Sequence, residues 1–155
     1  GLSGAIAILK NNKVLNIFEI PVMTEGKKNK RQLNSAQLVK LIRDNIMENE
    51  EVSVVVEQVN AMPGQGVTSM FNFGQTFGAI KGICAAMNLP IFFVRPSKWK
   101  KHFELINSSK DASRTKAIEM YPSLSNDLAK KKDVNKSDAI LFARFYCETR
   151  LIEDI

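Results

Sequence analysis

The hydrophobic pattern of the first half of the chain predicts several strands. Ala5–Leu9 and Lys13–Ile20 flank Asn11–Asn12, which suits a tight turn, so this region predicts a β-hairpin. Val52–Val56 is nearly continuous, β-branched and apolar, which is typical of a strand buried on both faces. Leu89–Val94 has a similar composition and predicts a further strand.

Between and after these strands, apolar residues recur at helical spacing. They predict helices over Ala36–Met47, Val67–Met87, Ser97–Phe103, Asp111–Tyr121 and Ala139–Ile152. Asn34 and Ser35 can cap the first of these helices. Pro21–Leu33 contains Gly26 and several cations, and it predicts a basic loop. The order of elements predicts an α/β fold with a mixed sheet flanked by helices.

The composition indicates what kind of partner the protein binds and in which compartment it occurs. The 155 residues are 45% hydrophobic, which suits one globular domain, and the net charge of +6 favours a polyanionic partner such as nucleic acid. Cys84 and Cys147 lie in apolar helical patterns without a CxxC or Cys/His cluster, so we expect reduced thiols and a cytoplasmic protein. Neither a signal-like start nor a membrane-length apolar run is present in the sequence, which argues against secretion and membrane insertion.

Carboxylates are the best candidates for chemistry. His102 is the only histidine and lies in a basic helix, so we interpret it as a surface residue, and no zinc cluster or phosphate loop motif occurs. Glu57 ends an apolar strand, at the edge where open α/β sheets bind ligands, although it could simply face solvent there. Asp133 and Asp138 stand at the start of the last helix. These oxygen ligands suit Mg²⁺ or Mn²⁺.

The sequence does not decide which residues near Asp133 and Asp138 bind the metal. Asp138 is unexpected among the apolar residues Ala139–Leu141 unless it has a ligand. Asp133 could instead be a helix N-cap. Asn135 is three residues before Asp138 and would lie on the same helical face as Asp138, whereas Asp133 would not.

A basic segment near the middle of the chain predicts contacts with phosphates. Its members are Lys98, Trp99, Lys100 and Lys101, followed by Lys110 and Arg114. Any one of these cations could be an ordinary surface charge. Together they favour sequence-independent binding of a nucleic-acid backbone.

Three glycines recur every four residues in the predicted helix Val67–Met87. Gly74, Gly78 and Gly82 each cost about 1 kcal/mol relative to alanine, so they predict close approach of another backbone. The groove that they form, with Phe71 beside it, is predicted to lie at a two-fold interface. The alternative is packing against the sheet of the same subunit.

Several motifs in the same order resemble one family. They are Gly1–Ala7, Val55–Val59, Phe73–Gln75, Pro96–Lys100 and Lys131–Ala139. The set resembles RuvC and, more closely, the phage and RuvC-like Holliday-junction resolvases. The resemblance implies one RNase H-like nuclease domain over residues 1–155, a homodimer, and cleavage of branched DNA, above all four-way junctions, with two Mg²⁺ or Mn²⁺ ions per active site. It also implies a bacterial cell or a phage-infected host.

The resemblance assigns catalysis and metal binding to Glu57, Asp138 and Asp133. It further implies that a central strand, ending in the first metal-binding Asp of the family, precedes Gly1 and is missing from this sequence. The interval from Asp133 to Asp138 is longer than the Asp-x-x-Asp of the family, so Asn135 remains an alternative ligand.

A second departure concerns the loop after the catalytic Glu. In bacterial RuvC an aromatic residue three positions after the catalytic Glu wedges into the junction. In this chain the corresponding position is Asn60. Met62, in the same loop, could act as an apolar wedge. Two other functions stay open: a non-catalytic protein that binds branched DNA, and an RNase H-like nuclease that acts on RNA or RNA/DNA hybrids.

Overall fold

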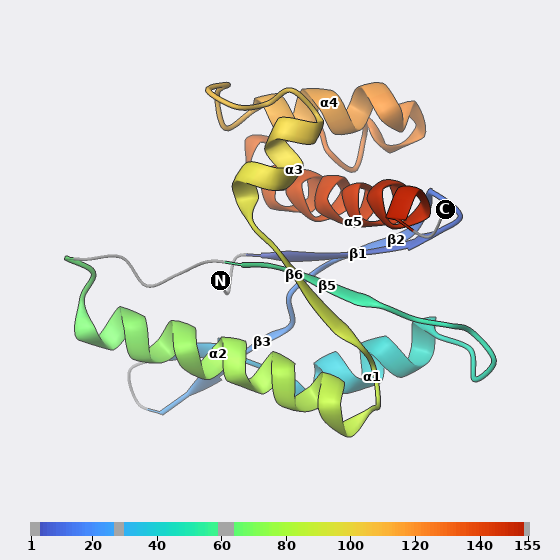
Figure 1. The fold of residues 1–155 in the computed structure, drawn as a ribbon. Coiled ribbons are helices and arrows are strands. Elements are labelled where there is room, and N and C mark those ends of the chain that lie inside the picture. The colour runs from blue at the N-terminus through green and yellow to red at the C-terminus, as the bar shows by residue number, and fades with distance from the viewer. Residues whose placement is uncertain (1–3, 27–29, 59–63, 154–155) are drawn as a thin grey trace. The chain divides into compact units, whose positions relative to one another are not determined.

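The chain folds into two compact units (Figure 1). The structure is a computed structural model that describes residues 4–26, 30–58 and 64–153. Among these residues the first unit comprises Ile20–Phe93, and the second joins Gly4–Glu19 to the part of the chain that begins at Val94. The single domain over residues 1–155 stays a prediction.

The first unit combines short strands with two helices. Its elements are β3 (Val22–Glu25), β4 (Lys30–Leu33), α1 (Ser35–Asn45), β5 (Val54–Glu57), α2 (Val67–Ala86) and β6 (Ile91–Val94), the last residue of which belongs to the second unit. β5 and β6 form a two-stranded parallel sheet. Helix α2 packs against α1 and β4. Asn34 caps α1 as predicted, because its side-chain oxygen accepts a hydrogen bond from the Gln37 amide at 3.0 Å.

The prediction of a basic loop over Pro21–Leu33 is wrong, because most of the described residues of this segment belong to two paired strands. β3 and β4 are antiparallel, with Val22 opposite Leu33 and Glu25 opposite Lys30. Next to the Val22–Leu33 pair, the Asn34 amide donates a further hydrogen bond to the Pro21 carbonyl at 2.9 Å. Strands of four residues that carry several charges show too little apolar alternation to be recognised from the pattern.

The second unit is built around its last helix. Its elements are β1 (Ala5–Lys10), β2 (Lys13–Glu19), α3 (Pro96–His102), α4 (Ala112–Met120), α5 (Val134–Glu153) and two short 3₁₀ turns, Pro122–Leu124 and Lys131–Asp133. Helix α5 contacts β1, β2, α3 and α4. Ala139–Leu141 of α5, Trp99 of α3 and Leu128 are buried, and each large apolar side chain contributes about 1.5–3 kcal/mol through burial.

The first predicted hairpin is confirmed. β1 and β2 are antiparallel, with Ala5 opposite Glu19 and Lys10 opposite Lys13. The two turn residues have left-handed backbones, with φ of 51° at Asn11 and 64° at Asn12. Positive φ at both central positions gives the twist that a two-residue hairpin needs, and asparagine tolerates it better than most residues.

The α/β class is confirmed, because the described chain combines helices with small β-sheets. The described strands pair as three separate two-stranded sheets, β1 with β2, β3 with β4 and β5 with β6. One mixed sheet of the RNase H type therefore stays a prediction. Within the described ranges, no helix combines the length and the apolar character needed to cross a membrane.

Candidate functional site

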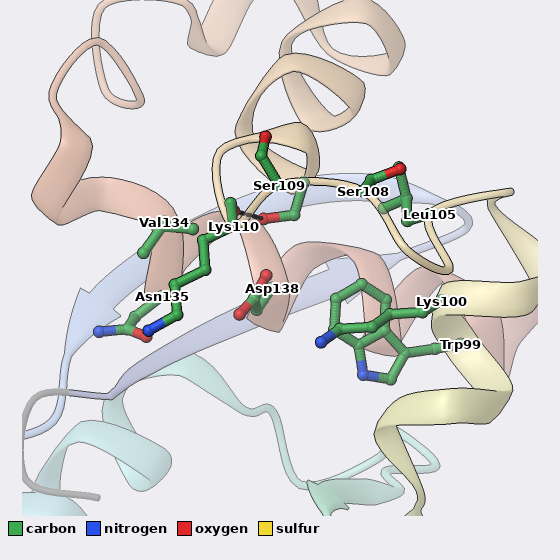
Figure 2. Close-up of a pocket in the computed structure, with 10 residues that line it drawn as sticks. Trp99, Lys100, Leu105, Ser108, Ser109, Lys110, Val134, Asn135 and Asp138 are labelled. Atoms are coloured by element: carbon green, nitrogen blue, oxygen red, sulfur yellow. Dashed lines mark hydrogen bonds between the residues drawn. The ribbon is translucent and has the colours of Figure 1, made fainter.

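A pocket of about 370 Å³ opens in the second unit (Figure 2). Its size lies within the range of about 300–1,000 Å³ that is typical of small-ligand sites. Its walls come from α3, the segment before α4 and the start of α5. The pocket therefore brings together residues that the sequence predicted for phosphate binding and residues that it predicted for metal binding. The lining residues with polar or aromatic groups include Trp99, Lys100, Ser109, Lys110, Asn135 and Asp138.

Helix α3 holds one cationic wall of the pocket. Pro96 begins the helix, where its fixed φ suits a helical start and its missing N–H costs nothing. Trp99 is fully buried, so its indole anchors the helix and supports the wall from within. The Lys100 ammonium lies 5.6 Å from the centre of the Trp99 ring, close enough for a cation–π interaction. The Trp99 ring and the Lys100 ammonium therefore lie together in this wall.

The first turns of α5 provide side-chain oxygen atoms to the wall of the pocket. Asn135 and Asp138 are three residues apart and share one helical face, as the spacing predicts. Figure 2 shows the Asp138 carboxylate between Lys100 on one side and the Lys110 and Asn135 side chains on the other. The pocket thus combines two cations with a carboxylate and an amide oxygen.

Asp133 has a different environment and is not among the residues that line the pocket. Its buried carboxylate accepts a hydrogen bond from the Lys130 amide at 2.9 Å, and lies 3.3 Å from the Lys136 ammonium. Burial alone would raise the pKa of Asp133, but these two partners outweigh it and lower the pKa. The carboxylate caps the 3₁₀ turn Lys131–Asp133, which is followed directly by α5. Its role as a metal ligand stays a prediction.

Glu57 lies at the end of β5 in the first unit, and its side chain is partly buried. Asp133 and Asp138 belong to the second unit. The grouping of the three carboxylates stays a prediction. Within the described ranges, no three His, Cys, Asp or Glu residues form a group that could hold a metal ion.

The other predicted DNA contacts differ in their surroundings. Lys98 and Lys101 are exposed on α3, and neither is among the residues that line the pocket. Arg114 is mostly buried, and its guanidinium contacts groups of its own unit. Asn60 and Met62 lie outside the described residues.

The glycine stripe of α2 is open in the described structure. A Cβ atom added at Gly74, Gly78 or Gly82 would meet no described atom within 4 Å. The alternative of close packing within the same unit therefore finds no support there. Phe71, beside the stripe, is 69% exposed. The two-fold interface stays a prediction.

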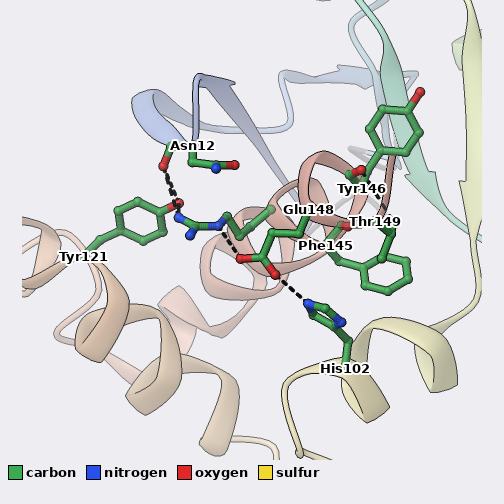
Figure 3. Close-up of polar contacts among 8 residues, drawn as sticks. Asn12, His102, Tyr121, Phe145, Tyr146, Glu148 and Thr149 are labelled. Atoms are coloured by element: carbon green, nitrogen blue, oxygen red, sulfur yellow. Dashed lines mark hydrogen bonds and ion pairs between the residues drawn. The ribbon is translucent and has the colours of Figure 1, made fainter. Parts of the chain in front are cut away.

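A polar network that the sequence did not predict joins four parts of the second unit (Figure 3). The His102 Nε2 atom of α3 pairs with Glu148 of α5 at 2.5 Å, and the Arg144 Nε atom donates to the other oxygen of the same carboxylate at 2.6 Å. Arg144 also donates to the Tyr121 hydroxyl, which in turn donates to the Asn12 carbonyl at 2.7 Å. His102 is exposed, as predicted, and it is also a structural partner of Glu148. Only the i, i+4 spacing of Arg144 and Glu148 indicated part of this network from the sequence.

Replacing Glu148 with Gln should destabilise the protein at neutral pH by about 1 kcal/mol, since the pair is partly buried. Burial would raise the pKa of Glu148, but the contacts with His102 and Arg144 lower it below its ordinary value. A depressed carboxyl pKa stabilises the fold above the unfolded-state pKa of about 4.3, and this stabilisation is lost as pH falls through the folded-state pKa.

Urea unfolding of the wild type and Glu148→Gln at neutral and acidic pH measures this effect. The difference in unfolding free energy should shrink as the solution becomes acidic. Glu119→Gln, at an exposed carboxylate of α4 that lies 3.6 Å from Lys116, serves as the control and should change little at either pH. A difference for Glu148→Gln that stays constant or grows in acid would contradict this role.

Comparison of the sequence with protein-family models and with curated proteins gave no match. The geometry of the pocket and the resemblance of the motifs are therefore the basis for a function.

Proposed function

We propose that the protein is a metal-dependent endonuclease that cleaves branched DNA, in the manner of RuvC-like Holliday-junction resolvases. The observation that carries this proposal is the pocket in which Asp138 lies between Lys100 and Lys110. These three residues were assigned from the sequence to metal binding and to phosphate binding. Their arrangement in one pocket supports a site where both tasks are performed together.

The donor set suits a phosphodiester that binds with a divalent cation. Two ammonium groups attract a phosphate, whereas the Asp138 carboxylate alone would repel it. Mg²⁺ prefers a site with one or two carboxylates, further oxygen ligands and phosphate oxygens, and Asp138 with Asn135 offers such oxygens. The residues therefore fit Mg²⁺ or Mn²⁺. Glu57 remains a predicted metal ligand.

In this mechanism the lysines neutralise the phosphate and hold the DNA backbone without reading its sequence. Asp138 and Asn135 would hold the divalent ion. A bound divalent ion would supply an activated water and stabilise the leaving 3′-oxygen. Trp99, buried below Lys100, keeps that ammonium at the pocket.

A two-fold dimer fits this activity, because a four-way junction presents two symmetric strands. Helix α2 offers a candidate surface for it, with exposed apolar side chains at Val67 and Phe71 and the open glycine stripe. Exposed apolar patches of this kind are common at protein interfaces.

A panel of labelled substrates tests the function. The full-length protein should cleave a four-way junction in Mg²⁺ or Mn²⁺, should cleave linear duplex much less, and should lose activity in EDTA. The Asp138→Asn protein, purified in parallel, controls for contaminating nucleases. Preferential cleavage of an RNA/DNA hybrid would favour the RNase H-like alternative, and tight junction binding without cleavage in any metal would favour a non-catalytic binding protein.

A further inference from the structure

Arg114 makes a forked contact with the segment that precedes α4. Its Nε and Nη2 atoms donate to the two carboxylate oxygens of Asp111 at 2.8 and 2.9 Å. Asp111 stands at the N-cap position of α4, yet its side chain makes no cap hydrogen bond. The Asp111 carboxylate binds the guanidinium instead, and this bidentate geometry fixes both side chains.

The same guanidinium also holds a distant segment of the chain. Its Nη1 atom donates to the Leu128 carbonyl at 3.1 Å and to the Ala129 carbonyl at 2.7 Å. The Leu128 side chain is fully buried, so this segment is anchored to the core of the unit. Arg114 therefore joins Asp111 to two carbonyl groups that lie 14 and 15 residues after Arg114 in the sequence.

Both segments continue directly into walls of the pocket. Asp111 follows Ser108–Lys110, which line one wall. Ala129 leads through the 3₁₀ turn, capped by Asp133, to Asn135 and Asp138 on another wall. The guanidinium thus contacts two segments that are directly connected to walls of the pocket.

We infer that Arg114 is a positioning residue that sets the distance between the Lys110 wall and the start of α5. Four of the five N–H donors of its side chain are engaged within the protein. A direct DNA contact, which the sequence predicted for Arg114, would have to compete with these hydrogen bonds. Lysine cannot replace the fork, because its three donors radiate from a single atom.

The fluorescence of Trp99 reports on the packing around the pocket in the absence of DNA and of any enzymatic activity. This residue is the only tryptophan of the sequence, it is fully buried, and it lines the same pocket. Arg114→Gln and Arg114→Lys should both shift Trp99 emission to longer wavelength and increase its quenching by acrylamide, because the wall next to it loosens. The spectra are recorded well below the unfolding transition of each variant.

Lys116→Gln is the matched control. It removes one positive charge from the same helix, but its contact is an exposed pair with Glu119 at 3.6 Å. Its Trp99 spectrum should equal that of the wild type. Should the Arg114 variants fail to fold, Asp111→Asn keeps the carbonyl contacts and should shift the spectrum in the same direction by a smaller amount.

The expected effect of Arg114 variants on DNA cleavage rests on the proposed function. Arg114→Lys keeps the charge, so a contact role predicts nearly normal cleavage, whereas a positioning role predicts a loss of kcat with a nearly unchanged KM. Wild-type Trp99 quenching in the folded Arg114 or Asp111 variants would overturn the inference. Failure of the wild type to cleave junctions would overturn the proposed function instead, and would leave the Trp99 result standing.

Discussion

Asp138→Asn should abolish metal-dependent cleavage of four-way junctions while binding is retained or strengthened. The change preserves the shape of the side chain but removes the negative charge that would hold a divalent cation in the proposed site. Loss of a charge that stabilises a transition state typically costs about 10²–10³-fold in rate, so we expect at least that loss. Binding should persist because Lys100 and Lys110 remain and a nearby negative charge is gone.

Single-turnover cleavage and anisotropy titration of the same labelled junction measure the two effects separately. Asp127→Asn is the control, because Asp127 is an exposed aspartate of the same unit and is not among the residues that line the pocket. It should retain wild-type cleavage. Glu57→Gln should lose activity as Asp138→Asn does, if Glu57 is a metal ligand. Full activity in Asp138→Asn would contradict the assignment of the pocket.

Charge reversal at Lys100 or Lys110 should weaken junction binding strongly and for every DNA sequence. Each phosphate contact releases condensed counterions, so the loss of one contact should reduce the salt slope of the affinity by about one. Lys100→Glu should have an additional effect, because its ammonium is held over the Trp99 ring beside Asp138. A carboxylate at this position would add a second negative charge to the pocket.

Lys101→Glu is a demanding control for this prediction. Lys101 is adjacent to Lys100 on α3 and has the same charge, but it is exposed and does not line the pocket. Affinities measured between about 50 and 200 mM salt should fall less for Lys101→Glu than for the two pocket variants. Equal losses at Lys100 and Lys101 would indicate a diffuse basic surface, and a salt-independent affinity would contradict the electrostatic account.

Local patterns were sufficient to predict much of the fold. The first hairpin followed from alternating residues around two asparagines, and the Asn34 cap and α2 followed from helix signals. The shared face of Asn135 and Asp138 followed from their spacing of three residues. Each of these features depends on residues that are close together in the sequence.

Contacts between distant segments could not be predicted in this way. From the sequence, Arg114 cannot be distinguished from the other cations of the basic region. Its contacts with the Leu128 and Ala129 carbonyls exist only in the folded chain. His102 and Glu148 are 46 residues apart, so no periodicity relates them. The strands β3 and β4 were missed for another reason, since their charged residues hide the alternation that marks a strand.

Trp99 fluorescence during titration with a four-way junction tests the central claim most directly, since this single tryptophan lines the pocket beside Lys100. The emission should change saturably as DNA fills the pocket, at the same concentrations at which anisotropy reports binding. Lys100→Glu and Lys110→Glu should shift both curves together to higher concentration. Junction binding that saturates by anisotropy while Trp99 emission stays constant would show that the DNA binds elsewhere.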